Sequence, residues 1–284
     1  MLILSVVLLK TSTFLMNFDF KTEQLEFRKQ CDTSLSQPNG WLAVAALEWL
    51  KEGSQTIGSG PDCNIKFPKS APLLAGTIKL IQGNVELLPS VGVHFQINNQ
   101  PAPIIIKTDE FGSADKIKLG NLTFSIIKRG NKYGIRLWDP EATTRKEFKG
   151  CHWFEAKESW VVQAKFVAHN PPKSLPITNI LGDTELSPNP GYVEFKIAGK
   201  THRLEAIDAG DELFFNFKDL TNGGKTYGAG RFLYTKAPKN GQVTLDFNQA
   251  VNPPCAYTAF ATCPLPPKAN YLQVAIEAGE LKTH

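Results

Sequence analysis

Short apolar runs separated by turn residues limit the fold of this chain more than any other feature. From residue 52 onwards, glycines and asparagines recur between stretches in which apolar and polar residues alternate. Such alternation is typical of strands with one buried face, and turns spaced by roughly eight to twelve residues are typical of a β-sandwich. The runs that carry this pattern in the first half are 77–81, 85–88, 93–97 and 122–127.

The same pattern restarts after a charged connector over residues 141–150. Its runs are 160–166, 192–197, 202–206, 212–217, 242–247 and 271–276, the last with Leu272, Val274 and Ile276 on one face. We therefore predict a mainly β protein with two antiparallel β units. The first is a sandwich over residues 33–140, and the second is a sandwich or a barrel over residues 151–284.

The N-terminal residues 1–32 are interpreted as a leader followed by a short helix over residues 21–31. Residues 2–9 are apolar but too short to span a bilayer, and they lack the flanks of an export signal. Three interpretations stay open: a disordered leader or a start-site artefact in which translation begins at Met16, a degenerate export signal, and an anchor. We expect a cytoplasmic protein without a membrane span, with export as the alternative.

Charge and cysteine usage exclude several classes of partner. The chain has 31 Lys+Arg and 27 Asp+Glu, without a basic run, so nucleic acid is not an expected partner. Its five cysteines include no C-x-x-C pair, and no Cys/His pair has zinc-ligand spacing, so we expect no metal and no cofactor. Cys255 and Cys263 are either bridged across a small Pro-rich loop or free buried thiols.

Several strings in the second half resemble one known family. The most specific is Asp246-Phe-Asn248-Gln-Ala-Val-Asn252-Pro-Pro-Cys255-Ala-Tyr257, followed by Ala261-Thr-Cys263-Pro-Leu-Pro-Pro267. These residues resemble the domain of unknown function 1684 family, over about residues 24–280. Val251 departs from the family, which more often has tyrosine there. The resemblance implies a domain organisation and a candidate site, but no reaction.

The first β unit also resembles forkhead-associated sandwiches in its turns at Gly58-Ser59 and Asn98-Asn99. Ser59 stands where those domains have arginine, and residues 71–76 replace the Ser-Arg-x-His segment that grips phosphothreonine. Without those charge-assisted donors a phosphopeptide loses its main anchor. We therefore expect the sandwich without phosphothreonine binding, and contact with a protein partner through this domain.

Polar residues of the second unit form the candidate site. Asp246 and Cys255 are the candidate catalytic residues, and Arg231 is the candidate anchor for an anion. The other candidate ligand-binding residues are Asp219, Thr226, Tyr227, Asn248, Asn252 and Asn270. The alternative is a structural network in which these side chains cap turns and Arg231 pairs with Asp219 or Asp246.

These observations favour a small-molecule binding module that takes an anionic ligand in a polar pocket of the second unit. An enzyme, such as a hydrolase that uses Asp246 or Cys255, is the first alternative. A purely structural interaction protein is the second.

Overall fold

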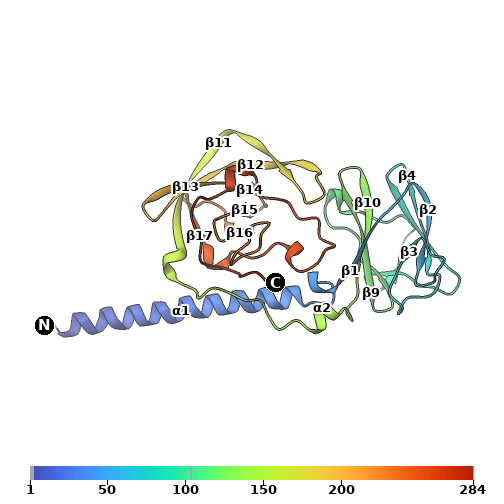
Figure 1. Ribbon diagram of the computed structural model, residues 1–284, viewed down its shortest axis with the longest axis horizontal. Coiled ribbons are helices and arrows are strands. Elements are labelled where there is room, and N and C mark those ends of the chain that lie inside the picture. Colours follow the sequence, from blue (N-terminus) through green and yellow to red (C-terminus); the bar gives the residue numbers. More distant parts are fainter. Residues whose placement is uncertain (1–2, 103, 284) are drawn as a thin grey trace. The chain divides into compact units, whose positions relative to one another are not determined.

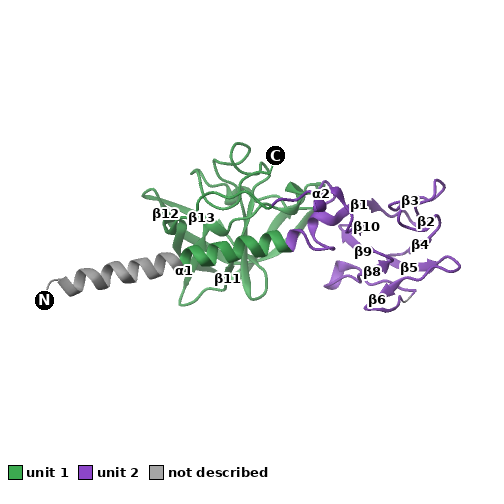
Figure 2. Ribbon diagram, turned by 90° about the horizontal axis from the view of Figure 1, so that it is seen from below, with its two compact units in different colours: residues 1–33, 150–257, 262–284 green, residues 34–149, 258–261 purple. Residues whose placement is uncertain are grey.

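The computed structural model describes residues 3–102 and 104–283, and within the N-terminal helix it describes side chains from residue 19 onwards. The chain forms two compact units (Figures 1 and 2). Unit 1 comprises residues 1–33, 150–257 and 262–284, and unit 2 comprises residues 34–149 and 258–261. The predicted leader over residues 1–15 lies outside the described side chains, so its interpretation stays a prediction.

Unit 2 is built from short strands, as the spacing of its turn residues predicted. Its helical segments are η1 (Trp41–Ala43), η2 (Asp109–Phe111) and α2 (Thr143–Lys146). Its strands are β1 (Val44–Trp49), β2 (Gly53–Gly58), β3 (Ile65–Lys66), β4 (Gly76–Ile81), β5 (Asn84–Pro89), β6 (Gln96–Ile97), β7 (Gln100–Pro101), β8 (Ile117–Leu119), β9 (Leu122–Arg129) and β10 (Lys132–Trp138).

The strands of unit 2 form two sheets with apolar side chains between them. One has the order β1-β10-β9-β8-β6-β7 and the other the order β3-β2-β4-β5. Phe124, Ile126 and Ile135 are fully buried in the core, together with Ile57 and Ile78 from the second sheet. The opposite face of β9 and β10 carries Ser125 and Arg136, which are paired directly across the two strands.

Unit 1 contains the long N-terminal helix and the remaining strands. Its helical segments are α1 (Ile3–Leu35), η3 (Glu158–Trp160), η4 (Phe247–Gln249), η5 (Pro254–Ala256) and η6 (Lys268–Asn270). Its strands are β11 (Val161–Thr178), β12 (Thr184–Ile197), β13 (Lys200–Glu205), β14 (Ile207–Asp208), β15 (Glu212–Phe217), β16 (Arg231–Lys236) and β17 (Gln242–Asp246).

The strands of unit 1 also form two sheets, of orders β13-β12-β11-β17 and β14-β15-β16. Phe215, Phe217 and Phe247 are fully buried in the core of this unit, with Leu245 and Ile276. Among the described strands no sheet closes on itself, so the barrel alternative is wrong. The prediction of a mainly β protein is confirmed, and the sandwich is the arrangement that fits unit 1.

Helix α1 is much longer than the helix predicted over residues 21–31, and its C-terminal half packs on unit 1. Gln24 is buried and donates from Nε2 to Asp246 Oδ2 at 2.7 Å. Arg28 Nη2 donates to the carbonyl of Phe154 at 2.8 Å, and Phe27 packs edge-on against Trp153. These contacts explain why residues up to Thr33 belong to the C-terminal unit.

The predicted final strand over residues 271–276 is wrong, although its apolar face is right. Leu272 and Ile276 are buried in the core, and Val274 packs against it. The backbone N–H of Leu272 bonds to the carbonyl of Lys218, whereas that of Ile276 bonds to the side chain of Asp219. The segment has one isolated bridge, between Lys218 and Tyr271, and it bends at residues 273–274, so it forms no regular ladder.

Among the residues that the structure describes, no helix combines the length and the apolar character needed to span a membrane.

Candidate functional site

Arg231, the predicted anion anchor, lies in a closed ion pair inside unit 1. Its side chain and that of Asp219 are both 0% exposed, and Nη2 donates to Asp219 Oδ2 at 2.6 Å. Nη2 also donates to the carbonyl of Ile276 at 2.9 Å, and Nη1 donates to the carbonyl of Ala278. Burial lowers the pKa of the Arg231 guanidinium, and the nearby Asp219 opposes that shift. The guanidinium therefore already has its counter-charge from the protein.

The local backbone brings Arg231 to this position. Gly230, just before β16, has φ +113°, a conformation that side-chain-bearing residues rarely adopt. A Cβ atom there would lie 2.7 Å from the carbonyl oxygen of Phe217. The chain thus needs glycine to enter β16 close to β15, and this entry directs Arg231 into the core.

Asp219 also organises the turn that precedes Arg231. Its Oδ1 accepts hydrogen bonds from the backbone N–H of Thr221 at 2.8 Å and from Thr221 Oγ1 at 2.6 Å. Thr221 Oγ1 in turn lies 2.8 Å from Oγ1 of Thr226, which is fully buried. Asp219 and Thr226, which were both predicted to bind a ligand, are therefore linked through the Thr221 hydroxyl. Both side chains cap the turn.

Asn270, which lies in η6, links two strands of unit 1 through its buried amide. Its Oδ1 accepts from the backbone N–H of Glu205 at 2.7 Å. Its Nδ2 donates to the carbonyls of Glu205 and Asn216, each at 3.0 Å. With Asn270 0% exposed, all three bonds are shielded from water, and the amide acts as a cross-link between β13, β15 and η6.

Asp246 and Asn248 lie together, although not as alternate residues of one strand. Strand β17 ends at Asp246, which caps η4 by accepting from the backbone N–H of Asn248 at 3.0 Å. Asn248 Nδ2 donates to the same carboxylate at 2.8 Å and to the carbonyl of Lys157 at 2.9 Å. With the amide of Gln24 on its other oxygen, Asp246 is occupied as a cap.

Asn252 lies beside a buried carboxylate that the sequence analysis did not identify. Glu280 is 1% exposed, and its Oε2 accepts from the backbone N–H of Asn252 at 2.8 Å. Tyr257 donates its hydroxyl to Glu280 Oε1, and Cys151 Sγ lies 3.6 Å from the same hydroxyl. Burial raises the pKa of Glu280. Nothing in the sequence spacing of Glu280 indicated this partner set.

Cys255 and Tyr227 form the last group of predicted site residues. The Tyr227 hydroxyl donates to the carbonyl of Cys255 at 3.0 Å. The backbone N–H of Cys255 points at the sulfur of Cys263, at 3.1 Å. Both cysteines are free thiols, which corresponds to the unbridged alternative.

The predicted residues thus form separate hydrogen-bonded groups: Arg231 with Asp219 and Thr226, Asp246 with Asn248, and Cys255 with Tyr227. A hollow of about 370 Å³ lies in unit 1 where β11 and β12 separate, between Ala164 and Phe195. None of the predicted site residues lines this hollow. The geometry therefore favours the structural alternative for the group, and a ligand role stays a prediction.

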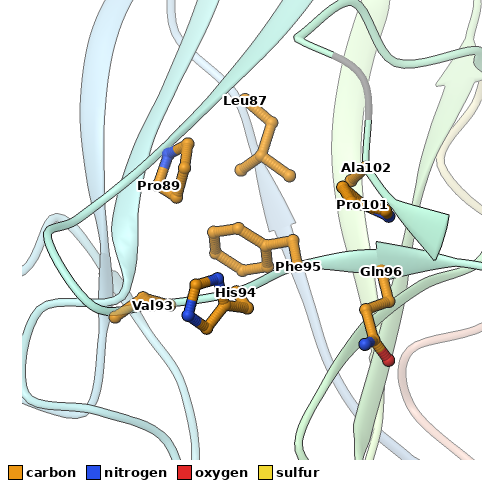
Figure 3. A pocket seen from close by; sticks show the side chains of 8 residues that line it. All are labelled: Leu87, Pro89, Val93, His94, Phe95, Gln96, Pro101 and Ala102. Atoms are coloured by element: carbon orange, nitrogen blue, oxygen red, sulfur yellow. The ribbon is translucent and has the colours of Figure 1, made fainter. Parts of the chain in front are cut away.

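Unit 2 contains hollows of two different characters. The first, of about 210 Å³, is lined mainly by apolar side chains (Figure 3). Leu87, Pro89 and Phe95 surround it, and His94 and Gln96 carry its polar side chains. Among the described residues that line it, none is an Asp, Glu, Lys or Arg that would select a ligand by charge.

The second hollow of unit 2, which we call the tryptophan cleft, has a volume of about 370 Å³. Its lining residues come from η1, the segment around η2, and the outer face of β9 and β10: Asn39, Trp41, Asp109, Gly112, Ser113, Ala114, Lys116, Ser125, Ile127, Arg136 and Trp138. Arg136 and Trp138 are two residues apart on β10, so their side chains share one face of the sheet. The opposite face packs into the core.

Two cations and two indole rings define the tryptophan cleft. Lys116 Nζ lies 3.7 Å from the ring centroid of Trp138, and Arg136 Cζ lies 4.9 Å from that of Trp41. Burial and the positive charge of Arg136 together lower the pKa of Lys116, and Asp109 opposes the shift. The Asp109 carboxylate also accepts from the backbone of Lys128 at 2.7 Å and from Arg129 at 2.8 Å. Among the residues that line this cleft, Asp109 is the single carboxylate and it serves these other donors.

Comparison with known proteins matches the C-terminal half of the chain. Residues 146–281 match the family model described as a protein of unknown function, DUF1684. A solved structure, an uncharacterised protein of the archaeon Haloarcula marismortui, is similar at 32% identity over 48% of this chain and 78% of that chain, with a TM-score of 0.41. No curated protein matches the chain. The resemblance predicted for residues 24–145 stays a prediction, as does the forkhead-associated-like character of unit 2. The match to the DUF1684 family of proteins of unknown function therefore lies in the C-terminal half of this chain, over residues 146–281.

Proposed function

We propose that this protein binds a small organic anion, and that the binding site is the tryptophan cleft of unit 2. The observation that carries the proposal is the pair of cations, Lys116 and Arg136, on the wall of one cavity. The anionic class of ligand is the one that the sequence favoured. The proposed anchors are Lys116 and Arg136 instead of the predicted Arg231, because Arg231 is paired with Asp219 inside unit 1.

An anion fits this cleft on electrostatic grounds. The pKa of Lys116 is lowered partly by Arg136, so the two positive charges repel each other in the empty cleft. A carboxylate or phosphate between them would reverse that cost and accept charge-assisted hydrogen bonds. Of the described lining residues, Lys116 and Arg136 are positively charged and Asp109 is negatively charged, and Asp109 also accepts hydrogen bonds from Arg129 and the backbone of Lys128.

Size and lining point to an anion with an apolar or aromatic body. The volume of about 370 Å³ lies within the range of small-molecule pockets, which is about 300–1,000 Å³. Trp41, Trp138 and Ile127 provide apolar wall, and Ser125 and Asn39 provide hydroxyl and amide groups. Apolar and polar side chains therefore both line the cleft, and small-molecule sites use polar groups beside apolar ones to orient a ligand.

Tryptophan fluorescence tests the proposal, with adenosine monophosphate, citrate and inorganic phosphate as probes. We expect at least one organic anion to change the emission saturably, with an affinity that falls as salt is added. Lys116→Gln should weaken that binding by about tenfold, which is ~1.4 kcal/mol. Lys118→Gln is the matched control, because Lys118 lies on strand β8, two residues after Lys116, and does not line the cleft. This variant should bind like the wild type. Equal affinities of the two variants would contradict the proposal.

The alternatives from the sequence remain predictions. A hydrolase that uses Cys255 needs a base, and no histidine among His94, His152, His169 and His202 makes a hydrogen bond to Cys255 in the described contacts. Asp246 is held by Gln24 and Asn248. A protein partner for unit 2 and a cytoplasmic location rest on the sequence alone.

A further inference from the structure

Two of the five cysteines lie side by side in unit 1. Cys255 lies in η5 and is half-buried, and Cys263 follows eight residues later, 4% exposed. The hydrogen bond of 3.1 Å from the Cys255 backbone to Cys263 Sγ brings that sulfur next to the Cys255 residue. Two side chains in this relation need little backbone movement to form a disulfide.

The surroundings of Cys255 stabilise its thiolate. The interaction with the Cys263 thiol, and to a smaller extent that with Tyr227, lowers the pKa of Cys255 to about 7 against the opposing effect of burial. At neutral pH a thiol with such a pKa is about half ionised, whereas an ordinary cysteine is ionised to a few per cent. Tyr227 is itself fixed by its bond to the Cys255 carbonyl.

The other cysteines of unit 1 have the opposite environment. Burial and the Glu280 carboxylate raise the pKa of Cys31 to about 12. Burial, followed by the same carboxylate, also raises the pKa of Cys151. Cys31 and Cys151 are therefore inert thiols in the same fold, and they serve as internal controls.

We propose that Cys255 and Cys263 form a dithiol site that exchanges with small-molecule disulfides, with Cys255 as the attacking thiol and Cys263 as the resolving thiol. The Cys255 thiolate attacks one sulfur of the external disulfide, a new S–S bond forms, and one external thiolate leaves. Cys263 then loses its proton to solvent and attacks Cys255 Sγ, and the second external thiolate leaves. The two cysteines are oxidised to one disulfide, and the external disulfide is reduced to two thiols.

The chain between the two cysteines runs through unit 2. Residues 258–261 belong to unit 2, where Phe260 packs against Ala43, Val44 and Trp138. A bond between Cys255 and Cys263 would close the base of this loop. Trp138 is also a wall of the tryptophan cleft. The dithiol site itself does not depend on the proposed anion binding.

The test uses 5,5′-dithiobis(2-nitrobenzoate), a disulfide that releases a coloured thiolate. We expect the full chain to release two thiolates per chain in a fast phase, to retain no adduct by mass spectrometry, and to yield a Cys255–Cys263 peptide. Cys263→Ser should release one thiolate and retain the adduct, and Cys255→Ser should lose the fast phase. The variants Cys31→Ser and Cys151→Ser should behave like the wild type.

The pH dependence separates an activated thiol from mere exposure. The fast rate should rise with a midpoint near the Cys255 pKa of about 7. At pH 7, the thiolate fraction should exceed that of an ordinary thiol by roughly tenfold. A midpoint near 8.5, a fast phase that persists in Cys255→Ser, or a wild-type chain that retains the adduct would each overturn the proposal. If circular dichroism shows Cys255→Ser to be unfolded, the Cys263→Ser stoichiometry and the peptide map decide the question.

Discussion

Arg231 in unit 1 and Arg136 in unit 2 are both buried, and each lies over an aromatic ring, but they face different surroundings. The Arg231 guanidinium is 5.3 Å from the centroid of Phe217 and bonds to a carboxylate and two carbonyls. The Arg136 guanidinium is 4.9 Å from the centroid of Trp41 and shares a cavity with Lys116. The two buried arginines therefore differ in their described neighbours, which are a carboxylate at hydrogen-bond distance for Arg231 and a second cation on the same cavity wall for Arg136.

The largest effect should come from the Arg231 pair. Arg231→Met leaves the buried Asp219 carboxylate without its counter-charge, and breaking such a pair costs about 3–5 kcal/mol. Urea unfolding of the variant and the wild type measures this change. Arg203→Met is the matched control, because Arg203 forms an exposed ion pair with Glu194 and should unfold close to the wild type. A stable Arg231→Met would show that the pair is dispensable and leave a ligand role open.

The next effect should come from Asn270. Asn270→Ala removes three buried hydrogen bonds and leaves backbone groups of Glu205 and Asn216 without partners. We expect a loss of about 2–3 kcal/mol in the unfolding free energy. Gln273→Ala, at an exposed position of the same segment, is the control. A loss no larger than that of the control would contradict the role of Asn270 as a cross-link.

The raised pKa of Glu280 should be detectable in the pH dependence of the unfolding free energy. Because burial raises its pKa, the folded protein binds a proton that the unfolded chain has already released. Stability therefore falls as the pH rises from the ordinary glutamate pKa, about 4.3, through the raised value. In urea unfolding between pH 4 and 7, Glu280→Gln should gain stability relative to the wild type as the pH rises.

The control residue is Glu277, whose contribution to stability should change with pH in the opposite direction to that of Glu280. Lys225 lowers the pKa of the exposed Glu277, so its contribution is present above the ordinary glutamate pKa and is lost as the pH falls. Glu277→Gln should therefore not gain stability relative to the wild type as the pH rises. Parallel curves for the two variants would show that Glu280 is not a buried acid.

The smallest effect on stability is expected at Lys116. Lys116→Gln removes the contact with Trp138 but also the repulsion from Arg136, so the two contributions oppose each other. We expect a change in unfolding free energy of less than about 1 kcal/mol without ligand. A loss of unfolding free energy as large as that of Arg231→Met would show that Lys116 stabilises the fold as Arg231 does. It would contradict the proposed difference between the two sites.

The strand pattern was largely readable from the sequence, and its failures have physical reasons. The prediction ended the strand at residue 166, whereas β11 continues to Thr178. Pro171 and Pro172 lie within β11, in the register shift between Ala168 and Lys173, where β11 does not need to donate to β12. Side-chain bonds to Asp219 replaced the ladder expected over residues 271–276.

The candidate site was less accessible to sequence reasoning. Asp219 and Arg231 were expected either to bind a ligand or to form an ion pair. The distance of 2.6 Å between Arg231 Nη2 and Asp219 Oδ2 shows that they form an ion pair. The tryptophan cleft was missed because Trp41, Lys116 and Arg136 are far apart in the chain and come together only through strand register. The alternation Arg136-Leu-Trp138 was a signal, since it aligns a cation and an indole on one face.

The most direct test of anion binding in the tryptophan cleft is the response of the indole N–H signals to adenosine monophosphate in ¹⁵N-labelled full-length protein. The chain contains five tryptophans, and each provides one indole signal that a Trp→Phe variant assigns. The account predicts saturable shifts confined to Trp41 and Trp138, weakened by salt. Shifts that centre on Trp49, Trp153 or Trp160, or unshifted Trp41 and Trp138 signals in titrations with adenosine monophosphate, citrate and phosphate, would contradict it.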